Sequence, residues 1–122
     1  MIVRVRPNDC ATAGYAGGVT VCRVWRTRID PREADAYRRF AADESLPMFR
    51  SHDGFLGVVF GEAAAERVVI TFWRSAEAVE ELDASPRYHR TVERIESTGF
   101  IVGPSSVDVF EVGGGAIDAP LF

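Results

Sequence analysis

The chain of 122 residues contains no lysine, and all fourteen of its basic residues are arginine. The absence of lysine excludes Schiff-base chemistry and a phosphate-loop lysine, so any cationic site must use a planar guanidinium. Acidic residues outnumber basic ones, giving a formal net charge of -4. This balance argues against a nucleic-acid partner, because binding to phosphates requires a basic surface.

Cysteine and long apolar runs are also scarce. The spacing of Cys10 and Cys22 fits no CxxC motif, and a buried free thiol is the expected state of Cys22. No window approaches the eighteen apolar residues of a membrane span, and residues 1–18 lack the apolar segment of a signal peptide. We therefore expect a cytoplasmic protein in a reducing compartment, with no membrane partner.

The chain instead alternates between strand and helix patterns. Runs rich in β-branched residues predict strands over 19–28, 55–62, 67–73 and 106–112. One helix is predicted from the N-cap Asp30 to an end or kink at Pro47, and another from Ser75, with a restart at Ser85, to a stop at Gly99. The order strand, helix, strand, strand, helix, strand predicts an α+β ferredoxin-like fold, a four-stranded antiparallel sheet with helices on one face.

One such domain is expected over 19–112, after a leader or loop over 1–18 and before a Gly-rich tail over 113–122. Its central strands are apolar on both faces. Strict alternation places Val68, Ile70 and Phe72 opposite Val69, Thr71 and Trp73, and places Leu56, Val58 and Phe60 opposite Phe55 and Val59. Because two helices cover only one face, we expect a homodimer packed sheet to sheet, a dimeric α+β barrel.

The segments "VCRVWRTRIDPREADAYRRF" and "ITFWRSAEAVEELDASPRYHR" resemble the antibiotic biosynthesis monooxygenase (ABM) family of dimeric α+β barrel proteins, over Val19 to Val112. The most specific feature is Trp73 at the end of a strand, followed by a polar N-cap and a helix. The family includes cofactor-independent oxygenases of anthrones and quinols, and haem-degrading monooxygenases. The resemblance implies a pocket between the sheet and the helices of each subunit, lined by the tryptophan that matches Trp73.

Positions that match functional residues of the family differ in this chain. The anthrone oxygenases carry an amide where this chain has Val69 and a tyrosine where it has Val79. The haem degraders carry an Asn, a Trp and an axial His at the positions of Val24, Leu82 and Val92. His89 lies three residues before that axial position and so points in a neighbouring direction. We therefore expect no haem and no other cofactor.

The resemblance implies a cofactor-independent monooxygenase acting on an aromatic, polyketide-like small molecule such as a quinol or an anthrone. With no nucleotide fingerprint or metal-ligand cluster in the sequence, the electrons for oxygenation would come from the substrate. Two alternatives stay open: a cyclase or isomerase acting on a similar substrate, and a non-catalytic dimer that binds a small molecule. The candidate substrate-binding residues are Trp73, Thr71, Val69, Phe40, Phe49 and Leu82, and the candidate catalytic residues are His89, Tyr37 and Tyr88.

Each candidate also has a structural interpretation. Trp73 can fill the core, and Trp25 fits packing or a dimer contact. Tyr37 and Tyr88 fit hydrogen-bonded core tyrosines. His52 and His89 fit solvated surface histidines, and two isolated histidines make no metal site.

Overall fold

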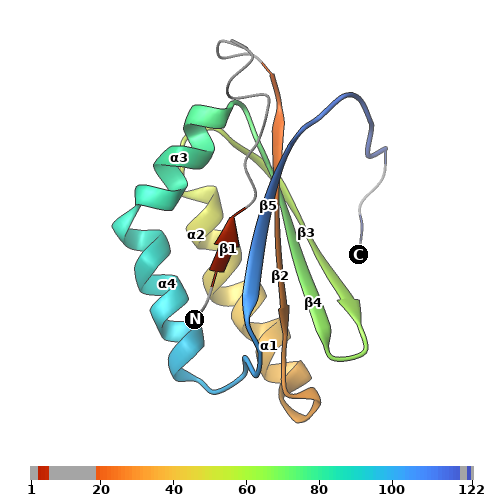
Figure 1. Ribbon diagram of the computed structural model, residues 1–122, viewed down its shortest axis with the longest axis vertical. Coiled ribbons are helices and arrows are strands. Elements are labelled where there is room, and N and C mark those ends of the chain that lie inside the picture. The colour runs from red at the N-terminus through yellow and green to blue at the C-terminus, as the bar shows by residue number, and fades with distance from the viewer. Residues whose placement is uncertain (1–2, 6–18, 119–120, 122) are drawn as a thin grey trace.

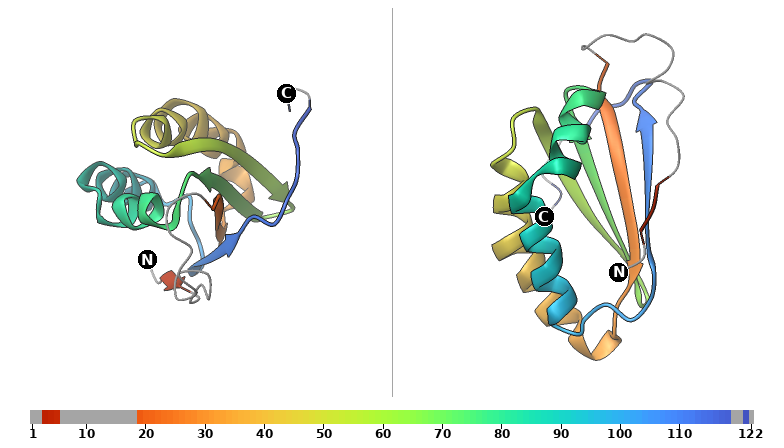
Figure 2. Two further views of the ribbon diagram at one scale, coloured as in Figure 1. Left: turned by 90° about the horizontal axis from the view of Figure 1, so that it is seen from above. Right: turned by 60° about the vertical axis from the view of Figure 1, so that its left-hand side comes forward.

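The computed structural model describes residues 3–5, 19–118 and 121. Five strands form one sheet, and the helices of the described chain cover one of its faces (Figures 1 and 2). The strands are β1 (Val3–Val5), β2 (Val21–Arg28), β3 (Phe55–Ala63), β4 (Glu66–Trp73) and β5 (Ser105–Glu111). The helical segments are η2 (Pro31–Glu33), α1 (Ala34–Phe40), η3 (Ala41–Ser45), α2 (Leu46–Arg50), α3 (Ala76–Ala84) and α4 (Pro86–Ser97).

The strand order is β1-β5-β2-β4-β3, and the pairs formed by β2, β3, β4 and β5 are antiparallel. These four strands with their helices confirm the predicted ferredoxin-like α+β fold. Strand β1 pairs parallel with β5 and adds a fifth strand, which was not anticipated for the segment 1–18. The other residues of that segment lie outside the described part of the chain.

Side-chain caps fix where the helices begin. The Asp30 carboxylate accepts a hydrogen bond from the backbone N–H two residues on, at 3.0 Å. The hydroxyls of Ser75 and Ser85 each accept from the backbone N–H three residues on, at 3.2 and 3.3 Å. After α4, Gly99 takes a φ of +79°. All four predicted boundary signals are confirmed, because each depends on local geometry alone.

The first long helix does not end at Pro47. The five residues of η3 form a π-helical turn, in which the Leu46 N–H donates to the Ala41 carbonyl five residues back. Pro47 has no N–H for the carbonyl of residue 43, the acceptor that an α-helix would use. The predicted end or kink is therefore a widened turn, after which the helix continues as α2.

Two features of the β3–β4 hairpin differ from the sequence expectation. The predicted strands end at residue 62 and resume at 67, whereas β3 runs to Ala63 and β4 starts at Glu66, which leaves a two-residue turn with Ala64 at a φ of +53°. A register shift between Phe55 and Gly57 also breaks the strict alternation of β3. Phe55 therefore packs into the core together with Val58 and Phe60, so its predicted placement opposite them was wrong.

The main core lies between the sheet and the helices. Trp73 and Leu82 are fully buried there, and Val69 and Thr71 face the same side, as alternation predicted. On the opposite face Val68, Ile70 and Phe72 are half-buried, and no helix of the described chain covers them (Figure 2). In that described part, every helix is too short or too polar to traverse a lipid bilayer.

Candidate functional site

A small cavity lies between the sheet and the helices, where the family resemblance places a pocket. Its volume is about 50 Å³. Its lining comes from strands β2 and β4 and from the helical segments α1, η3, α2 and α4, and combines aromatic walls with a few polar groups. The aromatic residues are Trp25, Tyr37, Phe40, Phe49 and Tyr88, and the polar residues are Arg23, Ser45 and Thr91. Pockets for drug-sized ligands usually measure roughly 300 to 1,000 Å³, so a bicyclic ring enters this cavity only if its walls move apart.

The structure brings five of the nine predicted site residues to this cavity. They are Val69, Phe40, Phe49, Tyr37 and Tyr88. Trp73, Thr71 and Leu82 are at most 1% exposed and belong to the core around it. His89 is exposed on α4 and does not line the cavity.

Trp73 lies behind Phe49, with the two rings edge to face at 6.4 Å between centroids. Its ring also packs edge to face on Phe55 at 5.5 Å. The indole Nε1 donates a hydrogen bond of 2.7 Å to Thr71 Oγ1, and that hydroxyl donates to the Arg23 carbonyl at 3.4 Å. The polar atom of Trp73 is thus satisfied within its own strand, as a buried indole requires.

Arg23 is a candidate functional residue that sequence reasoning missed. It is 4% exposed, and its Nη2 donates to the Tyr88 hydroxyl at 2.7 Å and to Asp83 Oδ1 at 3.2 Å. The guanidinium carbon also lies 5.1 Å from the centroid of the Tyr88 ring, a cation–π contact. Strand alternation could have found it, because it places Arg23 between Val21 and Trp25 on the face that the helices cover.

Tyr37 is buried to the same extent as Arg23, at 4% exposure. Burial raises the pKa of its hydroxyl to about 12, although the nearby Arg67 guanidinium acts in the opposite direction. The phenol therefore keeps its proton at neutral pH. Tyr37 can donate a hydrogen bond to a ligand oxygen, but it cannot serve as a base there.

The two histidines differ from each other. His52 is half-buried, with Nδ1 2.8 Å from the Met48 carbonyl oxygen and Nε2 2.7 Å from Ser85 Oγ. A carbonyl only accepts, so Nδ1 carries a proton and His52 joins α2 to the start of α4. The expectation of a solvated surface side chain is therefore wrong for His52.

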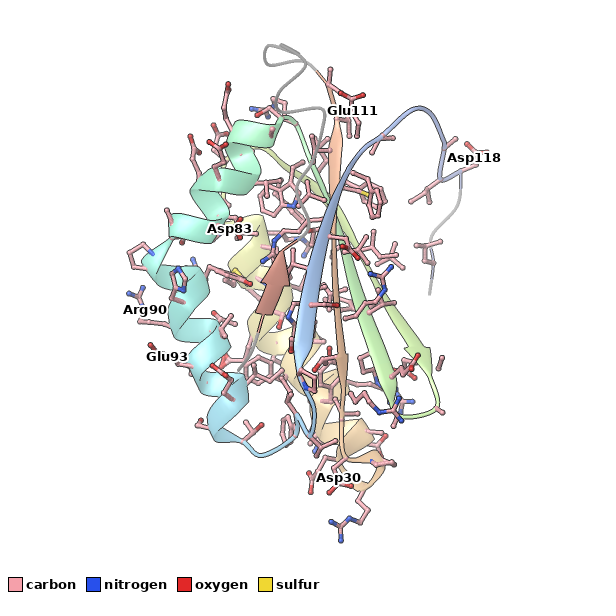
Figure 3. The ribbon with its side chains drawn as sticks, viewed as in Figure 1. Asp30, Asp83, Arg90, Glu93, Glu111 and Asp118 are labelled. Atoms are coloured by element: carbon pink, nitrogen blue, oxygen red, sulfur yellow. The ribbon has the colours of Figure 1, made fainter. Side chains whose placement is uncertain are left out.

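His89 does lie on the surface. Its Nε2 donates to the Asp83 carbonyl at 2.6 Å. This side of α4 faces solvent, because Arg90 and Glu93 are exposed and project away from the sheet (Figure 3). Asp83 lies near the junction of α3 and α4.

The positions that match the haem-site residues of the family do not converge. Val24 lies on the sheet face that the helices leave open, whereas Leu82 is core and Val92 lines the cavity. Residues 23 and 25 of β2, and not residue 24, face the cavity. Within residues 3–5, 19–118 and 121, no three His, Cys, Asp or Glu side chains group to hold a metal ion.

Several solved structures share this fold. A monooxygenase from Streptomyces coelicolor, ActVA-Orf6 in complex with nanaomycin D, matches 83% of this chain and 94% of its own, with 20% identity and a TM-score of 0.70. SnoaB, a cofactor-independent oxygenase from Streptomyces nogalater, matches 81% and 98%, with 18% identity and a TM-score of 0.60. Rv0793 from Mycobacterium tuberculosis matches 82% and 97%, with 22% identity and a TM-score of 0.60.

No protein-family model matches the sequence, and no curated protein matches it significantly. At these low identities the likeness concerns the backbone, and a shared scaffold does not fix chemistry. The chain thus has the fold of the antibiotic biosynthesis monooxygenases, and the resemblance read from its sequence is confirmed at the level of that fold.

Proposed function

We propose that this chain is a cofactor-independent monooxygenase of the ABM type, acting on a small aromatic, quinol- or anthrone-like molecule bound between the sheet and the helices. The observation that carries the proposal is the make-up of the cavity, which combines aromatic walls with a buried guanidinium and two tyrosine hydroxyls. Among proteins of the same fold, SnoaB is a cofactor-independent oxygenase and ActVA-Orf6 is a monooxygenase with bound nanaomycin D.

The reaction balances without an external reductant. An anthrone-like CH₂ loses a proton to water, by way of the proposed relay through His89, to give an enolate. The enolate transfers electrons to O₂ and forms a carbon-bound peroxide, which takes up a proton to become a hydroperoxide. Loss of water from the peroxide leaves a ketone, so one CH₂ and one O₂ yield one C=O and one H₂O. The protein has to hold the ring, exclude bulk water and handle the proton.

Tyr88 and Tyr37 are the proposed catalytic tyrosines, acting as hydrogen-bond donors to the enolate oxygen of the ligand. Arginine only donates hydrogen bonds, so Tyr88 accepts from Arg23 and keeps its own O–H for a ligand oxygen. Tyr37 stays protonated and provides a second donor. A relay through His89 stays a prediction; its ring centroid lies 5.5 Å from that of Tyr88.

The ligand would occupy the space between Val69 on the sheet and Phe40 and Phe49 on the helices. Because the cavity measures about 50 Å³, binding requires the side chains of Phe40, Met48 and Phe49 to move apart. Trp73 and Thr71, with Leu82, form the buried layer that supports this wall. The small volume also favours a second candidate function, a non-catalytic dimer that binds a smaller molecule.

Oxygen uptake with a panel of hydroquinones, naphthoquinols and anthrones tests the proposal. We expect enzyme-dependent uptake of one O₂ per anthrone oxidised, with no added flavin or metal, and a strong decrease in Tyr88→Phe. Rearranged product without oxygen uptake would instead indicate a cyclase or isomerase. Ligand-induced stabilisation without turnover would indicate the binding protein.

A further inference from the structure

Arg23 is a buried cation whose charge is only partly compensated. Its side chain is 5% exposed, whereas the side chain of its partner Asp83 is 49% exposed. The two meet through one contact, Nη2 to Oδ1 at 3.2 Å, and not through the paired contacts that a guanidinium and a carboxylate can form. A half-solvated carboxylate is screened by water, so much of the positive charge remains uncompensated inside the protein.

Arg23 also retains a hydrogen-bond donor. Its Nη2 serves both Tyr88 and Asp83, but Nε is buried and has no partner among the described residues. A buried N–H without an acceptor is unfavourable, and a bound ligand or water that accepts from it is one way in which native structures satisfy such a group. Arg23 belongs to the lining of the cavity, so an acceptor bound there lies beside this guanidinium.

The surroundings of Arg23 define which anion fits. Trp25, Phe40 and Phe49 give the cavity flat apolar walls, and the Tyr88 ring lies against the guanidinium. Ser45 and Thr91 are the small polar groups of the lining, and neither carries a charge. An aromatic ring with one negatively charged oxygen satisfies both the walls and the cation.

We propose that Arg23 binds an anionic oxygen of the ligand, and that the ligand class is aromatic acids and ionised phenols or enols. The inference rests on the ligand site proposed above, and it selects from the possible aromatic substrates those with an acidic group. A guanidinium beside an enolate oxygen would also favour the ionised form of that substrate. The cation must be arginine, because the chain has no lysine.

Matched pairs of charged and neutral probes test the anion preference. We would measure binding of benzoate against benzamide, and of 2-naphthoate against 2-naphthamide, by calorimetry at pH 7. The native protein is expected to bind each carboxylate at least about tenfold more tightly than its amide. Arg23→Gln should abolish the preference, and Arg23→Lys should retain part of it because the charge remains while the planar fork is lost. Equal affinities within each pair, or no binding by any of the four probes, would overturn the proposal.

Asp83→Asn separates ligand binding from a merely structural ion pair. Asp83 competes for the guanidinium that the ligand needs, so its neutralisation should tighten carboxylate binding several-fold and leave amide binding unchanged. An ion pair that only stabilises the fold would show lower stability and no change in the preference. The outcome is independent of turnover: a carboxylate preference without oxygen uptake would refute the oxygenase and leave this inference standing.

Discussion

Replacing Trp73 by phenylalanine would test whether this residue supports the cavity wall or contacts the ligand itself. The indole is fully buried, packs on Phe49 and Phe55, and donates to Thr71 Oγ1 at 2.7 Å. Phenylalanine would leave a void of about 40 Å³, which costs about 1 kcal/mol at the usual ~24 cal/mol per Å³. The lost buried hydrogen bond adds about 1 kcal/mol, so the free energy of unfolding should fall by about 2 kcal/mol.

Urea unfolding followed by circular dichroism would measure this loss. In thermal unfolding at a fixed protein concentration, the Tm should fall by about 10 °C. Because Trp73 lies behind Phe49 and outside the cavity lining, the affinity for an aromatic probe should change less than about threefold. Trp25→Phe is the matched control: Trp25 lines the cavity, so this change should alter probe affinity more than it alters stability.

Thr71→Val probes the same hydrogen bond from its other end. That variant leaves the indole N–H buried without an acceptor and should lower the free energy of unfolding by about 1 to 3 kcal/mol. In the Trp73→Phe background, which lacks this N–H, the same change should lower it by less. The reasoning is refuted if Trp73→Phe costs under about 0.5 kcal/mol, or if it weakens probe binding tenfold at unchanged stability. Trp73 would then be a ligand contact, as the family resemblance implies.

Three further predictions follow from particular residues. Ionisation of Tyr37 should destabilise the fold in alkali. Its pKa of about 12 in the folded protein exceeds the ordinary value of 10, so the unfolded chain loses this proton at a lower pH. The free energy of unfolding should therefore fall by about 3 kcal/mol as the pH rises from 10 to 12. Tyr37→Phe should remove that part of the alkaline loss in pH-dependent urea titrations, and no lysine titrates in this range to obscure it. Gly54→Ala should lower the free energy of unfolding by about 2 kcal/mol, because a Cβ at this position, with a φ of +86°, lies 2.7 Å from Ala78 Cβ. Gly99→Ala is the control for backbone strain alone, because Gly99 has a φ of +79° and open space around it. We also expect light scattering at micromolar concentration to give twice the 13.4 kDa chain mass, with the final strand, near residues 107–112, crossing the two-fold interface. Ile70→Asp on the open face should give monomers. A monomer mass for the native chain would contradict the sheet-to-sheet dimer.

The fold could be predicted from the sequence because its signals are local. Asp30, Ser75 and Ser85 each bond to backbone N–H groups two or three residues away, and Gly99 adopts its positive φ within one turn. The alternation in 67–73 correctly assigns Val69 and Trp73 to the helix-covered face, because the side-chain period of a strand is two. These interactions form between neighbours along the chain, so their pattern can be read without knowing where distant segments lie.

Other features depend on contacts between distant segments. The phase of β3 changes at a bulge that its pairing with β4 sets, and β1 exists as a strand through its pairing with β5. His52 reaches Ser85, 33 positions away, and Arg23 reaches Asp83 and Tyr88 across the core, 60 and 65 positions away. A sequence shows which groups are charged, but burial and partners decide whether a charge is solvated or available to a ligand. The composition thus established that arginine is the only side chain of this protein that is fully cationic at neutral pH, and only the packing of α3 and α4 onto β2 decided that Arg23 is buried beside the cavity with an unpaired donor.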